Sequence, residues 1–340
     1  MTVSGVTGAA LVAALAGTCL AVPAPPAQRG GAFNDRGSRF SIGVLRRDGI
    51  LVPFASFDGK RWNAPWPDSD ENVTLPIALG DVPKRWWGGG EGQPWTAWVG
   101  EPFAPQPLAL EKPVHFRAFC GSHVGISTRY RGGAFDTREP TVPKDGVAIA
   151  APQGAVTLKP ITRISTIAAD GKRMIAAITD TFNEEEAQAA RRFTAWLHPF
   201  GDAQRRRYPI ELEALYRARE TSARGEWSTN YVEAVRRFPA APQDKGCGLI
   251  TFVRGWVIER EGKEPVINIG ARVTYCDRAD VSFMLPFGRV AVDDERYWVY
   301  QTSSWRDEFY SVARVRPDEV QPVVAVAGGG CPREPLFRRP

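Results

Sequence analysis

Short β-type runs, each ended by Gly, Pro or an Asp-Gly pair, follow one another along most of this chain. The runs 40–45 and 50–57 flank Asp48-Gly49, a dipeptide typical of tight hairpin turns, and Asp170-Gly171 predicts a similar turn. The other runs, mostly with apolar and polar residues in alternation, cover 114–119, 124–130, 147–151, 156–158, 161–167, 174–179, 210–218, 231–238, 249–258, 266–275, 296–302 and 308–315. We therefore expect β structure to dominate.

One segment has a helical pattern instead. Asn183 is followed three residues later by Glu186, which is the arrangement of a helix capping box. Apolar residues then recur at helical spacing between 187 and 197, and His198-Pro199 is a stop signal. The pattern predicts a helix that begins near Asn183 and ends at His198.

This helix divides the chain into parts. We assign residues 1–27 to a signal peptide and Pro-rich leader, 38–180 to an N-terminal β region, 181–207 to the helix and a linker, and 208–331 to a C-terminal β region. A length of 340 residues accommodates one large or two medium domains. The expected fold class is mainly β, with two β-rich subdomains, sandwich-like or a divergent propeller, and one intervening α-helix.

The N-terminal segment resembles an export signal. Its first 28 residues contain no Lys, Arg, Asp or Glu, and residues 9–17 form an apolar run of signal-peptide length that is too short to span a bilayer. Small residues at Ala21 and Ala27 predict cleavage near one of them. No other stretch approaches the roughly 20 apolar residues of a transmembrane helix. We expect a periplasmic or secreted protein without a transmembrane segment in the mature chain.

Four cysteines remain after the leader, namely Cys120, Cys247, Cys276 and Cys331, and an even number favours disulfides in an oxidising compartment. If Glu261-Gly262 is a two-residue hairpin turn, positions whose numbers sum to 523 face each other, as Cys247 and Cys276 do, at a separation that suits a disulfide. Cys120 then pairs with Cys331. Free thiols or a metal site are the alternatives. No Cys-x-x-Cys spacing supports zinc, so we expect neither a metal nor a cofactor.

Six of the eleven tryptophans lie close together among Pro and Gly residues: Trp62, Trp66, Trp86, Trp87, Trp95 and Trp98. Aromatic faces on such loops provide contact area for flat, weakly polar ligands, sugars included. These six are therefore our candidate ligand-binding residues for a glycan or another cell-envelope polymer. The alternative interpretation is that the rings fill a core beneath long loops.

The remaining chemistry-bearing residues assign no catalytic site. His115 and His123 could meet across a hairpin near Cys120, where they would bind zinc or activate a thiol, but a disulfide is the better account of Cys120. Carboxylates are plentiful, yet no spacing selects a pair for acid–base hydrolysis.

A formal net charge of +5 arises from 35 Arg and 8 Lys against 38 acidic residues. In an exported protein this charge favours envelope polymers or lipid headgroups over nucleic acid as acidic partners. The sequence predicts an exported, non-catalytic binding or interaction protein of the bacterial envelope or extracellular space. A carbohydrate-active hydrolase with a carboxylate pair, or a purely structural envelope protein, is the alternative.

Overall fold

The computed structural model describes residues 38–66, 78–88, 93–99, 103–130, 145–152, 155–193, 198–240, 248–278 and 281–331. Within these ranges the chain is mainly β, as the sequence predicts, and forms three antiparallel sheets and one long helix. None of the helices in this part of the chain is both long enough and apolar enough to cross a membrane. The predicted leader, residues 1–27, lies outside the described residues.

The first sheet, which we call the N-terminal sheet, has the strand order β5-β4-β8-β1-β2-β7-β6, with β3 beside β2. Its strands are β1 (Phe40–Leu45), β2 (Ile50–Phe57), β3 (Trp62–Asn63), β4 (Trp95–Trp98), β5 (Pro105–Leu108), β6 (Leu110–Ala118), β7 (Gly121–Thr128) and β8 (Gly146–Ala150). The predicted β1–β2 hairpin is confirmed, and Gly49 has the positive φ of 80° that its turn requires. Two short 3-10 helices, η1 (Leu79–Asp81) and η2 (Lys84–Trp86), belong to the same part of the chain.

Two further sheets follow, which we call the middle sheet and the third sheet. The middle sheet consists of β18 (Val320–Gly330), β17 (Asp307–Val315), β16 (Glu295–Ser303), β15 (Phe283–Val292) and β9 (Leu158–Lys159), in that order. The third sheet consists of β10 (Thr162–Arg163), β11 (Glu211–Ser222), β12 (Gly225–Arg237), β13 (Leu249–Glu259) and β14 (Val266–Tyr275).

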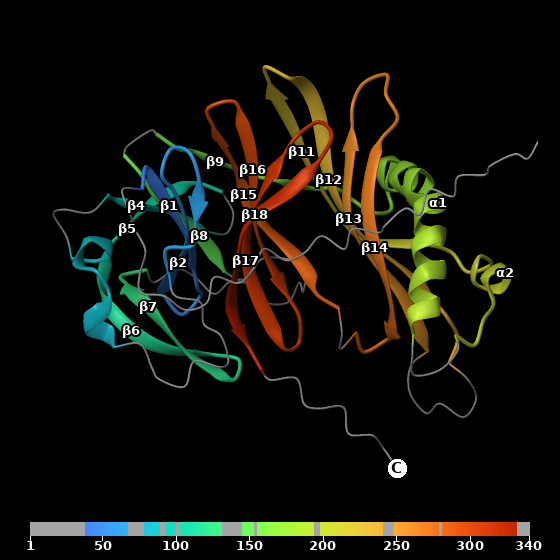
Figure 1. Cartoon of the computed structure of the whole chain (residues 1–340), viewed down its shortest axis with the longest axis horizontal. Coiled ribbons are helices and arrows are strands. Elements are labelled where there is room, and N and C mark those ends of the chain that lie inside the picture. The colour runs from blue at the N-terminus through green and yellow to red at the C-terminus, as the bar shows by residue number, and fades with distance from the viewer. Residues whose placement is uncertain are drawn as a thin grey trace, which may run out of the picture.

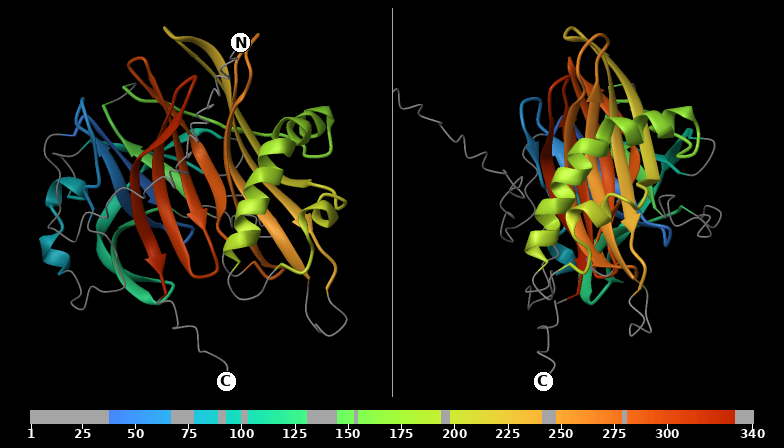
Figure 2. Two further views of the ribbon diagram at one scale, coloured as in Figure 1. Left: turned by 45° about the vertical axis from the view of Figure 1, so that its right-hand side comes forward. Right: turned by 90° about the vertical axis from the view of Figure 1, so that its right-hand side faces the viewer.

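The three sheets and the helix stack as four layers (Figure 1). Alternation along β16 shows the stacking: Tyr297 and Val299 belong to a core shared with the N-terminal sheet, whereas Trp298 and Tyr300 pack against the third sheet. Helix α1 (Ala169–Arg192) covers the other face of the third sheet (Figure 2). Face-to-face stacking is the sandwich-like form of the predicted fold class.

The helix begins earlier than the sequence predicts. Because α1 starts at Ala169, the strand expected at 174–179 and the hairpin turn expected at Asp170-Gly171 are wrong. Met174, Ile178 and Phe182 recur every four residues, and all three are fully buried against the third sheet. Gly171 is needed for close approach rather than for a turn, since a Cβ there would lie 2.0 Å from the Thr166 carbonyl oxygen.

The segment between the N-terminal sheet and the helix also differs from expectation. The sequence places residues 158–163 in the N-terminal β region, whereas in the structure β9 pairs with β15 of the middle sheet and β10 with β11 of the third sheet. The N-terminal sheet therefore ends at β8. Local sequence patterns indicate that a segment is extended, but the choice of sheet depends on distant partners.

The β13–β14 hairpin is confirmed as a hairpin, but its register is shifted by one residue. Leu249 faces Tyr275, so paired positions sum to 524 and Cys276 lies opposite Gly248, whose carbonyl oxygen accepts its N–H at 3.1 Å. A two-residue turn of the predicted kind needs positive φ at both residues. In this turn Gly262 has a φ of 65° and Glu261 does not have a positive φ.

Candidate functional site

The structure places most of the candidate tryptophans inside the protein. Trp66, Trp86, Trp95 and Trp98 are 4–6% exposed and belong to the core of the N-terminal sheet, while Trp62 and Trp87 are partly buried against it. Their rings therefore do not form an open platform. The alternative interpretation, that the rings fill a core beneath loops, applies to at least the four buried tryptophans. Ligand contact by the six residues stays a prediction that their burial disfavours.

Ring contacts explain why tryptophan is used here. Trp86 lies between Trp66 and Trp95, with ring centroids 5.8 Å and 6.4 Å away, and thereby packs the η2 segment onto the sheet. The indole N–H of Trp66 donates to the Val124 carbonyl oxygen at 2.8 Å. Trp62 reaches the middle sheet, where its ring centroid lies 5.1 Å from that of Tyr297.

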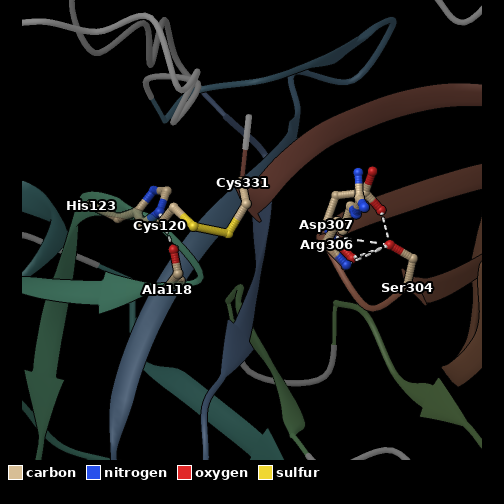
Figure 3. The surroundings of a disulfide bond; sticks show 7 residues. All are labelled: Ala118, Cys120, His123, Ser304, Arg306, Asp307 and Cys331. Atoms are coloured by element: carbon tan, nitrogen blue, oxygen red, sulfur yellow. Dashed lines mark hydrogen bonds between the residues drawn. A yellow bond between two sulfur atoms is a disulfide. The ribbon is translucent and has the colours of Figure 1, made fainter. Parts of the chain in front are cut away.

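The predicted disulfide between Cys120 and Cys331 is confirmed (Figure 3). It joins the β6–β7 turn to the end of β18 across 211 positions of sequence, with the two Cα atoms 4.8 Å apart. Two backbone bonds hold the same junction: Cys120 N–H donates to Gly330 at 3.3 Å, and Cys331 N–H donates to Arg306 at 2.8 Å. Cys120 is exposed, so the crosslink lies at the surface.

The structure describes only one cysteine of the second predicted disulfide. Cys276 is disulfide-bonded, whereas Cys247, its predicted partner, lies outside the described residues.

The histidines near the disulfide do not form a site together. His115 faces Val124 across the β6–β7 hairpin and is exposed, while His123 faces Phe116 and is buried on the opposite side of the sheet. His123 Nε2 lies 3.2 Å from the Ala118 carbonyl oxygen (Figure 3), and burial lowers the pKa of the His123 imidazole. The described residues contain no group of three His, Cys, Asp or Glu side chains that could hold a metal ion.

Two polar side chains, Tyr310 and Glu308, lie buried between the N-terminal and middle sheets. The Tyr310 hydroxyl donates to Glu308 at 2.5 Å, and burial, followed by the charge of Glu308, raises the pKa of Tyr310. At the end of β1, the Arg46 guanidinium lies 4.6 Å above the ring of Phe116 and forms an ion pair of 2.9 Å with Asp48. Arg46 therefore connects the buried ring of Phe116 to the surface turn between β1 and β2.

A pocket of about 390 Å³ opens at that turn. Its lining comes from the β1–β2 turn and from β6 and β7: Arg47, Asp48, Gly49, Ile50, Glu111, Ser127, Thr128 and Tyr130. Beside the pocket, β2 pairs with β7 at Ile50–Ser127 and Leu51–Ile126, and the β6–β7 register shifts between Leu110 and Pro113.

Hydrogen bonds fix the wall of the pocket that the turn provides. Gly49 N–H donates to the Arg46 carbonyl oxygen at 2.9 Å, and Asp48 Oδ1 accepts the N–H of Ile50 at 3.2 Å. From the neighbouring strand, the Thr128 hydroxyl donates to the Gly49 carbonyl oxygen at 2.8 Å. The turn is thus held from both sides, and its polar groups have defined positions.

The opposite wall carries a second carboxylate. Glu111 on β6 accepts a hydrogen bond of 3.4 Å from the Ser127 hydroxyl and lies 3.8 Å from the Arg129 guanidinium. Sequence reasoning identified the Asp48-Gly49 turn but not this pocket, because Glu111, Ser127 and Tyr130 lie more than 60 positions away. No local signal places those residues beside the turn.

Comparison with protein-family models, curated proteins and solved structures finds no match to this chain. The case for a function therefore depends on the geometry described above.

Proposed function

We propose that this chain is an extracytoplasmic, non-catalytic binding protein, and that the pocket at the β1–β2 turn is its recognition site. The observation that carries the proposal is the Cys120–Cys331 crosslink at the surface. Exposed disulfides persist in oxidising compartments, whereas the thiol-reducing systems of the cytosol keep such cysteines reduced. Together with the apolar run at 9–17, the crosslink supports export.

The pocket supports binding more than catalysis. Its two carboxylates already accept hydrogen bonds within the protein, Asp48 from Arg46 and Glu111 from Ser127. Groups held in this way present fixed acceptors to a ligand, which is the role of the few polar groups in most small-molecule sites.

A hydrolase is the second candidate, because one observation favours it. Asp48 and Glu111 line the same pocket, and glycoside hydrolysis uses two carboxylates that flank the substrate. Release of reducing sugar from polysaccharides by the wild-type chain, abolished in both Asp48→Asn and Glu111→Gln, would favour the hydrolase over the binding protein.

Export and crosslinking can be tested together. The full chain is expressed in a bacterial host, thiols are blocked before lysis, and unreduced peptides from each cell fraction are mapped by mass spectrometry. We expect the chain outside the cytosol, with Cys120 and Cys331 in one crosslinked peptide pair. A matched chain that starts at Gln28 should stay in the cytosol with both thiols blocked. A full chain that remains in the cytosol with blocked thiols would contradict the proposal.

A further inference from the structure

We infer that the pocket at the β1–β2 turn binds a neutral saccharide unit. The inference rests on the proposed binding function and specifies its ligand class. It is carried by three properties of the pocket: its balance of charge, its mixture of hydrogen-bond donors and acceptors, and the fixed position of its polar groups.

The charges around the pocket nearly cancel. Its charged lining residues are Arg47, Asp48 and Glu111, and the two carboxylates have Arg46 and Arg129 as partners at 2.9 Å and 3.8 Å. These five side chains carry three positive and two negative formal charges. A strong anion would meet two carboxylates and a cation would meet three guanidinium groups, so neither is favoured over a neutral ligand.

The hydrogen-bonding groups suit a ligand with many hydroxyls. Asp48 and Glu111 offer carboxylate oxygens that only accept, and Arg47 only donates. The Ser127 hydroxyl, whose hydrogen is directed at Glu111 and the Lys112 carbonyl oxygen, can accept, while a phenol hydroxyl such as that of Tyr130 is both a donor and an acceptor. Each sugar hydroxyl both donates and accepts, so neighbouring hydroxyls can use a carboxylate and a guanidinium at once. The aromatic ring of Tyr130 adds the apolar contact area that a sugar's C–H groups require.

Size and rigidity favour a small unit. A volume of about 390 Å³ lies near the lower end of the range of roughly 300–1,000 Å³ found for small-molecule pockets. The bonds from Ile50, Gly49 and Thr128 hold the turn in place, so little ordering is needed on binding. An open pocket of this size fits one end or one unit of a longer glycan.

The test uses the mature chain purified from the exported fraction of the expression host. It is screened on an array of neutral and acidic oligosaccharides, and the best neutral ligand is then titrated calorimetrically, with inorganic phosphate titrated in parallel. We expect binding of a neutral saccharide and none of phosphate. Glu111→Gln and Ser127→Ala should each weaken saccharide binding at least tenfold. The matched control Glu319→Gln, an exposed carboxylate outside the pocket, should leave the affinity unchanged.

Other outcomes overturn the inference. Affinity that is equal in wild type and both pocket variants, while their melting temperatures also agree, would place saccharide binding elsewhere. Phosphate binding that is lost in Arg47→Ala would assign an anion site instead. An exported, crosslinked chain that binds no array component refutes the saccharide inference but leaves the proposed compartment intact. A chain retained in the cytosol with free thiols refutes the proposed function itself.

Discussion

At the scale of single residues, Glu233 is the clearest case of a buried titratable side chain with a structural role. It lies on β12 and faces the middle sheet, where its Oε1 accepts the backbone N–H of Met284 at 2.7 Å. Burial raises the pKa of Glu233 to about 7, although Arg254 and the bond from Met284 act in the other direction. The negative charge of Glu213 raises the pKa of Glu233 further, whereas a hydrogen bond with Tyr231 lowers it.

This pKa predicts a pH dependence of stability with a definite sign. The folded state holds the Glu233 proton more tightly than the unfolded state, whose pKa is about 4.5. The stabilising contribution is therefore fully present below about pH 4.5 and is lost as the pH rises through 7. A shift of this size corresponds to about 3 kcal/mol. Glu233→Gln should remove this dependence, measured as the difference from wild type in urea unfolding between pH 4.5 and pH 8.

Comparison of wild type with Glu233→Gln at each pH cancels the effects of other titratable groups. One of these is His198, whose pKa is lowered to about 4, mainly by burial. Glu226→Gln, an exposed change on the same strand, is the control and should follow the wild-type curve. Parallel pH curves for wild type and Glu233→Gln would contradict the prediction.

At the scale of elements, a buried ion pair holds the second half of α1. Glu186, which the sequence predicts to be a helix-capping residue, lies two turns before the end of the helix and pairs with Arg236 of β12. Asn183, the predicted cap, accepts a bond of 3.0 Å from the same guanidinium. Arg205, from the short helix α2 (Asp202–Arg205), approaches Glu186 at 3.6 Å. One carboxylate thus connects two helices and the third sheet.

Removal of that carboxylate should be strongly destabilising. Glu186→Ala leaves Arg236, which is 3% exposed, without its anionic partner, and leaves Arg205, which is 4% exposed, with Asp202 alone. Breaking a buried pair in this way costs about 3–5 kcal/mol of unfolding free energy. Glu186→Gln, which keeps the shape and an acceptor, should lose less and serves if the alanine variant does not fold. Glu184→Ala, an exposed change on the same helix, should stay within about 0.5 kcal/mol of wild type in urea unfolding. Equal losses for Glu184→Ala and Glu186→Ala would contradict the role of the pair.

At the scale of the whole molecule, the N-terminal and middle sheets are joined twice. They share a continuous core, in which Phe54 packs against Tyr310 with ring centroids 5.7 Å apart, and they are crosslinked by Cys120–Cys331. The shared core means that the fold does not depend on the crosslink alone.

Loss of the crosslink should lower stability without unfolding the protein. A bond that closes a loop of 211 positions restricts the unfolded chain, and such disulfides typically contribute about 2–4 kcal/mol. Cys120→Ser combined with Cys331→Ser should therefore reduce the unfolding free energy by that amount, while the circular dichroism spectrum stays that of wild type. Cys120→Ser alone is the matched control and should show the same loss. Two separate unfolding transitions in the double variant would instead mean that the crosslink, not the core, couples the two sheets.

The limits of sequence-based prediction follow from the range of the interactions involved. The β1–β2 hairpin was predicted with its observed bounds because its Asp48-Gly49 turn is a local signal. The start of α1 was missed, since Met174 and Ile178 also suit a strand until the third sheet is placed against them. For the tryptophans the sequence leaves both ligand contact and a core beneath loops open, because composition does not reveal which side of a loop is covered.

Short-range stereochemistry follows directly from the order of the amino acids, and it determines the mainly β character and the β1–β2 hairpin. The pairing of Cys120 with Cys331 follows from the sequence only by elimination among four cysteines, because the two residues lie 211 positions apart. The stacking of three sheets, the burial of the tryptophans, the partner of Glu186 and the pocket that joins Asp48 to Glu111 required the packed chain. Each of these depends on contacts between segments tens of positions apart. Such contacts stabilise the protein only after folding has brought the segments together.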